Sequence, residues 1–287
     1  IIELGQRLGW NPLPISSPAA RQQWRNAPAK FTQRIVHSDK EVVLEATGVQ
    51  VVFGKTQAVH PTSLKLFGNQ MTALMGENGS GKSSLCWTLQ GSGTRSSGSV
   101  TISGVDPKDL SPQERLSRVT MVPQRAADLL FLHSLADELH ESDEFANVPA
   151  GTTAALFQQL AGRIDTSIHP RDMSAGQQLA LVLALQLVKD APIVILDEPT
   201  RGLDYAAKRA LAKQLDYLRA EDRGILIATH DIEFVAMVAD RVINIKDGQL
   251  VSDESPVIAL GYGQELASQL AEITAEAGLI TIEQVIP

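Results

Sequence analysis

An eight-residue glycine-rich segment places the strongest constraint on how this chain folds. Residues 76–83 read Gly-Glu-Asn-Gly-Ser-Gly-Lys-Ser and match the pattern G-x-x-x-x-G-K-[ST]. The segment follows the apolar run 71–75 and precedes residues 82–89, whose composition is helical. A strand, a turn of small residues and a helix in this order present backbone N–H groups to an anion at the start of the helix. The segment therefore predicts a phosphate-binding loop in an α/β protein.

Two side chains of this loop have specific expected roles. Lys82 can bridge the β- and γ-phosphates of a nucleotide, and the Ser83 hydroxyl can bind Mg²⁺. A glycine-rich turn that binds no ligand is the alternative, and the flanking strand and helix argue against it. The predicted nucleotide-binding residues of the loop are Gly76, Glu77, Asn78, Gly79, Ser80, Gly81, Lys82, Ser83 and Ser84.

Apolar runs after residue 41 predict a sheet whose strands are mainly parallel. Some of them, such as 193–196 and 225–228, are apolar at every position, which is typical of strands buried on both faces. Residues 128–190 are instead rich in Leu, Ala and Gln, which predicts a helical insertion. The runs that predict strands are 42–44, 49–53, 64–67, 71–75, 100–102, 119–122, 193–196, 225–228 and 242–245.

Polar residues follow two of these apolar strands. Asp197 and Glu198 come directly after 193–196, and His230 follows 225–229. Ligands of open parallel sheets gather at the carboxyl ends of the strands. Asp197 can hold Mg²⁺ through water, Glu198 can polarise the water that attacks the γ-phosphate, and His230 can contact either group. The alternatives are that Asp197 and Glu198 form a solvated strand end and that His230 is a turn or capping residue.

A further motif precedes the predicted apolar helix 179–188. Residues 173–178 read Met-Ser-Ala-Gly-Gln-Gln. Here the chain resembles the nucleotide-binding subunits of ABC transporters, whose signature is L-S-G-G-Q. It keeps Ser174, Gly176 and Gln177 and departs from the signature at Met173 and Ala175. Ser174 also has the composition of a helix N-cap, a role compatible with binding phosphate.

The resemblance implies a fold, cofactors and further site residues. It makes Gln124 the Q-loop glutamine, a ligand of nucleotide and Mg²⁺, Asp204 the D-loop aspartate, and Phe53 the aromatic residue that stacks on adenine. Lys82, Glu198 and the switch histidine His230 would be catalytic. The implied fold is a P-loop NTPase core with a mainly parallel sheet, an antiparallel β subdomain and a helical insertion. The implied cofactors are ATP and Mg²⁺, held between two modules that pair head to tail.

Residues 124–131 indicate a branch of the family. They resemble the Q-loop of energy-coupling-factor (ECF) importers, often Q-x-P-x-x-Q-[IL]-F, with a match at Phe131 and differences at Ala126 and Leu129. This likeness implies two membrane partners, a transmembrane scaffold and a substrate-binding component, and a peripheral location on the cytoplasmic face of the cell membrane. The cargo would be a vitamin, a vitamin precursor or a metal ion. An ordinary loop before a core helix is the alternative for Phe131.

The ends of the chain suggest its organisation. We expect an extension or linker over residues 1–40, an ABC ATPase domain over 41–250 with its helical insertion at about 128–190, and a tail over 251–287. Residues 4–15 resemble the tail of a first module in tandem ATPases, and residues 278–285 occupy the equivalent place here. Together with Ile1 in place of an initiator methionine, this favours the second half of a tandem ATPase over a plain extension.

Composition narrows the remaining functions. The formal charge is −8, from 25 basic and 33 acidic residues, which argues against a nucleic-acid partner. The single cysteine, Cys86, cannot form an internal disulfide, and no apolar run approaches the roughly 20 residues needed to cross a bilayer. The rival hypotheses are a non-transport ABC ATPase that acts on nucleic acid and a regulatory module with an inactive site.

Overall fold

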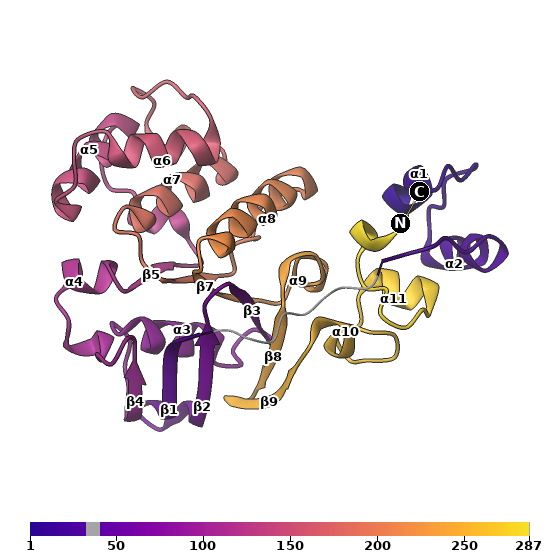
Figure 1. Ribbon diagram of the computed structural model, residues 1–287, viewed down its shortest axis with the longest axis horizontal. Helices are drawn as coiled ribbons and strands as arrows, with labels where there is room; N and C mark the ends of the chain where they lie inside the picture. The colour runs from indigo at the N-terminus through magenta and orange to yellow at the C-terminus, as the bar shows by residue number, and fades with distance from the viewer. Residues whose placement is uncertain (33–40, 287) are drawn as a thin grey trace.

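A six-stranded sheet forms the centre of the molecule (Figure 1). The computed structural model describes residues 1–32 and 41–286, so residues 33–40 of the expected extension lie outside it. The strand order is β5-β6-β7-β3-β8-β9, and all neighbours are parallel except β8 and β9. The strands are β3 (Gln70–Met75), β5 (Val119–Val122), β6 (Ile193–Asp197), β7 (Gly224–Thr229), β8 (Arg241–Lys246) and β9 (Gln249–Glu254).

Both faces of this sheet are covered, which explains the fully apolar strands. In β6, Ile193 and Ile195 pack with α3 (Lys82–Gln90) and the antiparallel strands, whereas Val194 and Leu196 pack with the helical layer. Successive side chains of a strand point to opposite faces, so a strand between two layers is apolar throughout. The mainly parallel sheet predicted from sequence is confirmed. Cys86 in α3 is buried, and burial raises the pKa of its thiol well above the ordinary value.

A three-stranded antiparallel sheet covers one side of the core. Its order is β2-β1-β4, formed by β1 (Val42–Phe53), β2 (Thr56–Phe67) and β4 (Ser97–Thr101). The predicted strands 42–44 and 49–53 are one strand, because the register with β2 shifts on either side of Gly48 without ending the pairing. The antiparallel β subdomain expected from the family resemblance is present.

A layer of helices lies between β5 and β6 in the chain and covers the opposite face of the sheet (Figure 1). It contains α5 (Leu135–Ala146), α6 (Thr152–Ala161) and α7 (Ala175–Leu187). Asp143 links α5 to α6, accepting hydrogen bonds from the backbone N–H groups of Gly151 (2.6 Å) and Thr153 (2.8 Å). The other helices around the sheet are α4 (Pro112–Leu116), α8 (Tyr205–Ala220), α9 (Ile232–Val238) and α10 (Pro256–Ala259). No helix within residues 1–32 or 41–286 has the length and hydropathy that a membrane crossing needs.

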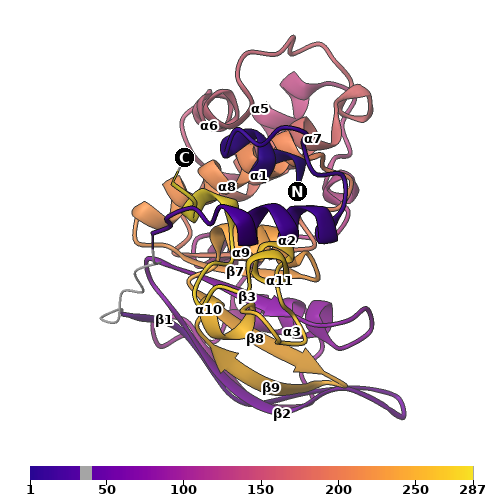
Figure 2. The same cartoon turned by 90° about the vertical axis from the view of Figure 1, so that its right-hand side faces the viewer.

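The two ends of the chain form a small body of their own, called here the terminal body (Figure 2). It consists of α1 (Ile2–Arg7), α2 (Ser17–Asn26), α11 (Gln269–Thr274) and the 3₁₀ turn η4 (Ile282–Gln284). The sequence of residues 1–32 showed no helical period, so α1 and α2 were not expected. The buried core of the terminal body is Leu4, Ala20, Trp24, Leu270, Ile273, Leu279 and Val285.

The two halves of the terminal body repeat one local pattern and pack crosswise. Each half has a six-residue helix, then a residue in the left-handed conformation, then a second element preceded by serine or threonine. That second element is the ten-residue helix α2 in one half and the three-residue 3₁₀ turn η4 in the other. Arg7 in α1 donates a hydrogen bond to the Val285 carbonyl oxygen beside η4 (2.8 Å). Arg21 in α2 donates to the Glu272 carbonyl oxygen in α11 (2.9 Å). The first helix of each half thus meets the second element of the other.

Trp24 provides a test of the terminal body as a packed unit. The side chain is only 2% exposed, so Trp24→Ala should lower the free energy of opening of this body by about 3–5 kcal/mol. Native-state hydrogen exchange should show faster exchange in residues 1–32 and 269–286, with α3 unchanged. Ile15→Ala is the control, because Ile15 is 90% exposed in the same body. Equal exchange in the two variants would contradict a core role for Trp24.

Candidate functional site

The glycine-rich loop joins β3 to α3 and surrounds the ammonium group of Lys82. Lys82 Nζ donates hydrogen bonds to the carbonyl oxygens of Gly76 (2.8 Å) and Glu77 (2.9 Å). Gly76 has no room for a side chain, because a Cβ there would lie 2.2 Å from the Ile245 carbonyl oxygen. Gly81, which caps α3, has a φ of 102°, a conformation that glycine adopts without strain. The loop therefore holds Lys82, which is 5% exposed, at the edge of a cleft.

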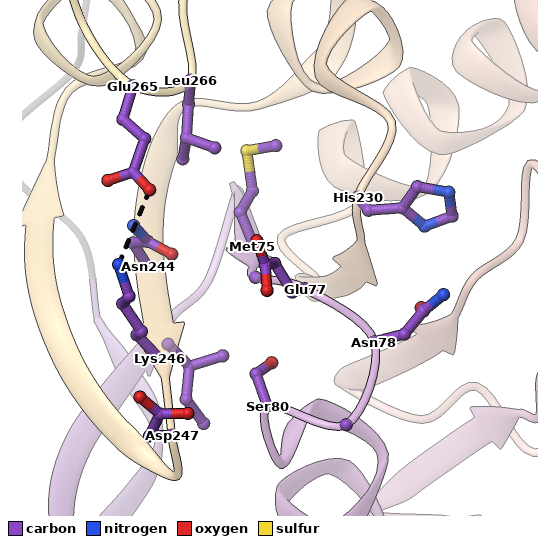
Figure 3. A pocket seen from close by; sticks show the side chains of 13 residues that line it. Met75, Glu77, Asn78, Ser80, His230, Asn244, Lys246, Asp247, Glu265 and Leu266 are labelled. Carbon is purple, nitrogen blue, oxygen red and sulfur yellow. Dashed lines mark ion pairs between the residues drawn. The ribbon is translucent and has the colours of Figure 1, made fainter.

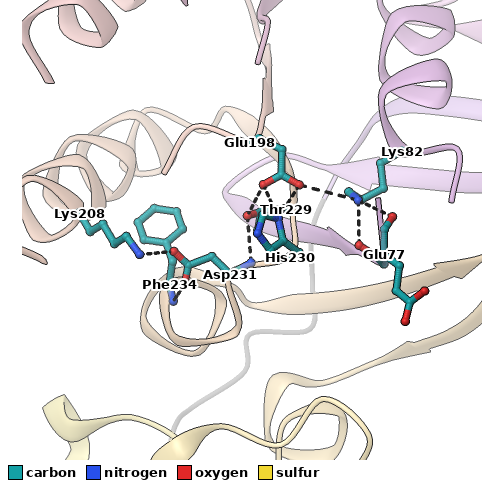
Figure 4. A network of polar contacts seen from close by, with 9 residues as sticks. Glu77, Lys82, Glu198, Lys208, Thr229, His230, Asp231 and Phe234 are labelled. Carbon is teal, nitrogen blue, oxygen red and sulfur yellow. Dashed lines mark hydrogen bonds and ion pairs between the residues drawn. The ribbon is translucent and has the colours of Figure 1, made fainter. Parts of the chain in front are cut away.

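Glu198 lies opposite this lysine at the end of β6 (Figure 4). Its carboxylate is 3.7 Å from Lys82 Nζ and accepts a hydrogen bond from the Thr229 hydroxyl (3.1 Å). His230 Nδ1 lies 2.9 Å from the same carboxylate. The backbone of Glu198 has a φ of 49°, and its N–H donates to the Ala228 carbonyl oxygen (2.7 Å). A left-handed glutamate fixed by its neighbours is a strained arrangement of the kind found at functional sites.

Asp197, the residue before Glu198, is 2% exposed, and its Oδ1 atom is buried with no hydrogen-bond partner. Burial raises the pKa of Asp197, and the negative charge of Glu198 adds to the rise, while Ser83 and Lys82 oppose it. An unsatisfied carboxylate oxygen beside a hydroxyl is a suitable donor set for a hard cation such as Mg²⁺. The residues present therefore fit the magnesium ion implied by the sequence.

Lys82, Glu198 and His230 line one cleft with a volume of about 570 Å³, whereas Asp197 is not among its lining residues. It brings the phosphate loop together with Gln124 and His230, which the sequence places 40 or more residues further along the chain. Arg201 also lines the cleft and was not predicted. The lining residues are Ala58, Asn78, Gly79, Gly81, Lys82, Ser83, Ser84, Gln124, Glu198, Arg201 and His230.

A second cavity, of about 450 Å³, lies along the other flank of the loop (Figure 3). Glu77 and Asn78 line it from the loop, and Lys246 lines it from the end of β8. Glu265, from the segment that leads into the terminal body, completes the wall and forms an ion pair with Lys246 (3.7 Å). The C-terminal region of the chain thus reaches the phosphate loop.

Comparisons with known proteins agree with this geometry. Residues 59–201 match a family model described as ABC transporter. A putative ABC transporter ATP-binding protein of Streptomyces coelicolor is 33% identical over 321 aligned residues, which cover 99% of this chain and 57% of that protein. This chain contains an ABC transporter ATP-binding domain.

Other relatives and structures extend the comparison. The ribose import ATP-binding protein RbsA of Jannaschia sp. is 30% identical over 73% of this chain and 42% of its own length. This chain therefore spans about half the length of the curated relatives it matches. Among solved structures, cbiO1 of Clostridium perfringens, described as part of the ABC transporter complex cbiONQ, has a TM-score of 0.66 at 24% identity. It covers 77% of this chain and 91% of its own, and supports the ABC ATPase fold.

The signature residues of the ABC domain lie outside its cleft. Ser174 caps α7 and forms a reciprocal pair with Gln177, whose side-chain oxygen accepts from the Ser174 N–H (2.9 Å). None of Ser174, Gly176 and Gln177 lines the cleft at the phosphate loop. A Cβ on Gly176 would contact only the Cβ of Ala207, at 3.9 Å, so packing within the chain does not require glycine there.

Two further predicted residues also lie away from the cleft walls. Asp204 caps α8 by accepting a hydrogen bond from the Ala207 N–H (2.8 Å). Phe53, at the end of β1, is 50% exposed and pairs with Thr56 in the antiparallel sheet. Their expected contacts with nucleotide stay predictions.

Thr229 and Arg201 are the site residues that sequence reasoning missed. Thr229 ends the same apolar strand that precedes His230, and a hydroxyl at that position was a usable signal. Arg201 follows Glu198 by three residues in a turn, where no local pattern distinguishes it from a solvent-exposed arginine. The tertiary structure identifies Thr229 and Arg201, because it places both near the carboxyl ends of the strands.

The raised pKa of Asp197 predicts how the ligand-free ABC domain responds to pH. A carboxyl whose pKa is raised by folding contributes stability at acid pH that is lost as the pH rises through the folded-state pKa. An asparagine side chain does not ionise, so Asp197→Asn avoids the cost of a buried charge. This variant should therefore raise the melting temperature by about 2–4 °C near neutral pH. This gain in melting temperature should shrink as the pH falls toward 3.8, the ordinary pKa of an aspartate carboxyl.

Scanning calorimetry without nucleotide, over a series of pH values, measures this difference. The control is Asp109→Asn, because Asp109 is an exposed carboxylate in a short 3₁₀ turn. A variant less stable than the unmodified chain near neutral pH would show that Asp197 is not held at an electrostatic cost.

Proposed function

We propose that this chain hydrolyses ATP and so energises a membrane importer of the ECF type, from the cytoplasmic face of the cell membrane. The observation that carries the proposal is the buried Glu198 carboxylate, held by Thr229 and His230 and facing Lys82. A carboxylate oriented by two neighbours can accept a proton from an attacking water, and a lysine beside it can neutralise phosphate charge.

The residues of the cleft divide this chemistry among them. Lys82 can exchange its bonds to the loop carbonyls for bonds to phosphate oxygens, and Glu198 can act as the general base. The His230 side chain is 63% exposed, so its outer ring nitrogen remains available to substrate. Mg²⁺ would supply further charge neutralisation, and Ser83, Asp197 and Gln124 are the residues that would hold it.

We further propose that the active unit contains a second ABC module, paired head to tail. The unoccupied space at Gly176 and the position of Ser174 outside the cleft both support a role for the signature in the partner's site. A solved ATP-binding cassette of the same fold is described as dimeric and bound to ADP and Pi.

The repeated, crosswise halves of the terminal body support the origin of residues 1–40 in a preceding module, with residues 41–250 as the ABC domain.

A groove beside the Q-loop supports the ECF branch. Phe131 is 76% exposed and Phe145 is 44% exposed, and both line a groove of about 430 Å³ between α5 and the segment around α4. Gln124, in the cleft, lies seven residues before Phe131. An apolar groove connected to the cleft by a short segment can receive a helix of a transmembrane scaffold and report the nucleotide state to it.

The comparisons favour one other cargo class. RbsA is described as a ribose import protein and AraG 2 of Burkholderia thailandensis as an arabinose import protein, the latter 29% identical over 84% of this chain. Sugar import is therefore the second candidate. The formal charge of −8 disfavours a non-transport ABC ATPase that acts on nucleic acid. Transport assays of the assembled complex with labelled sugars, vitamins and metal ions distinguish ECF-type import from sugar import.

Glu198→Gln tests ATP hydrolysis directly. The amide keeps the shape of the carboxylate but cannot accept the proton, so turnover should fall about 10²-fold or more while ATP affinity changes less than about twofold. The variant should accumulate an ATP-bound pair of modules, measured by size-exclusion chromatography with multi-angle light scattering. Glu144→Gln, an exposed carboxylate in α5, is the control. Unchanged turnover in Glu198→Gln would refute the assignment.

Phe131→Ala tests the scaffold groove. Loss of an apolar anchor should weaken binding of the scaffold by about 2 kcal/mol, or roughly 30-fold, with ATP affinity unchanged. Pull-down with the membrane component and transport in vesicles measure the effect. Ile258→Ala in α10 is the control, since Ile258 is 56% exposed and distant in the chain. If Phe131 serves the fold instead, its loss should lower melting temperature and ATP affinity together.

A further inference from the structure

Arg209 in α8 joins both ends of the chain to the ABC domain. One of its terminal nitrogens lies 3.0 Å from a Glu3 carboxylate oxygen and 2.9 Å from a Glu283 carboxylate oxygen. Its guanidinium also lies 5.2 Å from the centroid of the Tyr205 ring, one turn earlier in α8. The two halves of the terminal body therefore meet on one helix of the domain.

Helix α8 extends this contact to the candidate site. Asp204, the predicted D-loop residue, caps the helix five residues before Arg209. Lys208, the neighbour of Arg209, forms an ion pair with Asp231 (2.5 Å), and Asp231 directly follows His230 (Figure 4). Contacts thus connect the terminal body, through α8, to Asp204 and to Asp231, the residue that follows His230.

Helix α9 makes a second connection between the same parts. Glu233, in the first turn of α9, accepts a hydrogen bond from the Gln269 N–H at the start of α11 (2.6 Å). Asp231 caps the same helix by accepting from the Phe234 N–H (3.1 Å). Helices α8 and α9, which both contact the terminal body, therefore begin at loops that hold predicted site residues.

We propose that Arg209 is a positioning residue for ATP hydrolysis, which keeps Asp204 and His230 in place by fixing α8 against the terminal body. The inference rests on the proposed ATPase function. The Arg209 side chain is 40% exposed, and ion pairs at that exposure contribute little to stability. Its role is geometric, because a single guanidinium connects segments from the beginning, the middle and the end of the chain.

Arg209→Gln separates positioning from stability. In the full chain, kcat for ATP should fall about fivefold, while KM stays within about twofold and the melting temperature changes little. Arg209→Lys keeps the charge and should recover at least half of the lost rate. The control is Lys213→Gln, which removes a positive charge from an exposed position of α8 and should leave both constants unchanged. An unchanged kcat in Arg209→Gln, or a fall in kcat matched by a large fall in melting temperature, would overturn the proposal.

Hydrogen exchange tests the same link without hydrolysis. Amides of residues 205–209 and 231–234 should exchange faster in nucleotide-free Arg209→Gln than in Lys213→Gln. Faster exchange in a chain whose unmodified form hydrolyses no ATP would refute the proposed function and leave the mechanical link standing. Unchanged exchange would refute the link whatever the rate of hydrolysis.

Discussion

The buried contact between Lys82 and Glu198 is the interaction on which the candidate site depends. Each side chain is 5% exposed, and taking such charges out of water is costly unless each has a partner. Their partners come from three adjacent strands, since Lys82 follows β3, Thr229 ends β7 and Glu198 follows β6. The order β6-β7-β3 therefore creates the site. The neighbouring Asp197 has one buried carboxylate oxygen without a hydrogen-bond partner.

The ABC domain and the terminal body contact each other through apolar packing and a few polar contacts. Ala271 of α11 and Ile280 are buried in one apolar cluster with residues of β3, α9 and α10. The body has its own apolar core, built from segments at opposite ends of the chain. It meets the domain at α8 and α9, where carboxylates and one arginine are shared. The ion pairs of Arg209 add directional contacts to the apolar packing.

Local patterns predicted much of the fold and the central site residues. The glycine-rich loop, the apolar strands and the carboxylates after β6 are short-range signals, because each depends on the conformation of a few consecutive residues. The signals were weaker where tertiary packing decides. Helices α1 and α11 have six residues each, too few to form alone, and they exist because their apolar side chains meet across the chain. Strand β9 was missed because its acidic edge position carries no apolar run.

The sequence by itself determined the phosphate loop, the parallel α/β class and the family resemblance, since these follow from backbone conformation and residue chemistry along short stretches. Tertiary structure decided which of these stretches are neighbours. It placed Thr229 and Arg201 at the loop, left Ser174 outside the cleft, and joined Glu3 to Glu283 through Arg209. Those outcomes depend on strand order and on packing between distant segments, and no local pattern contains the free energy of contacts that form only when the whole chain has folded.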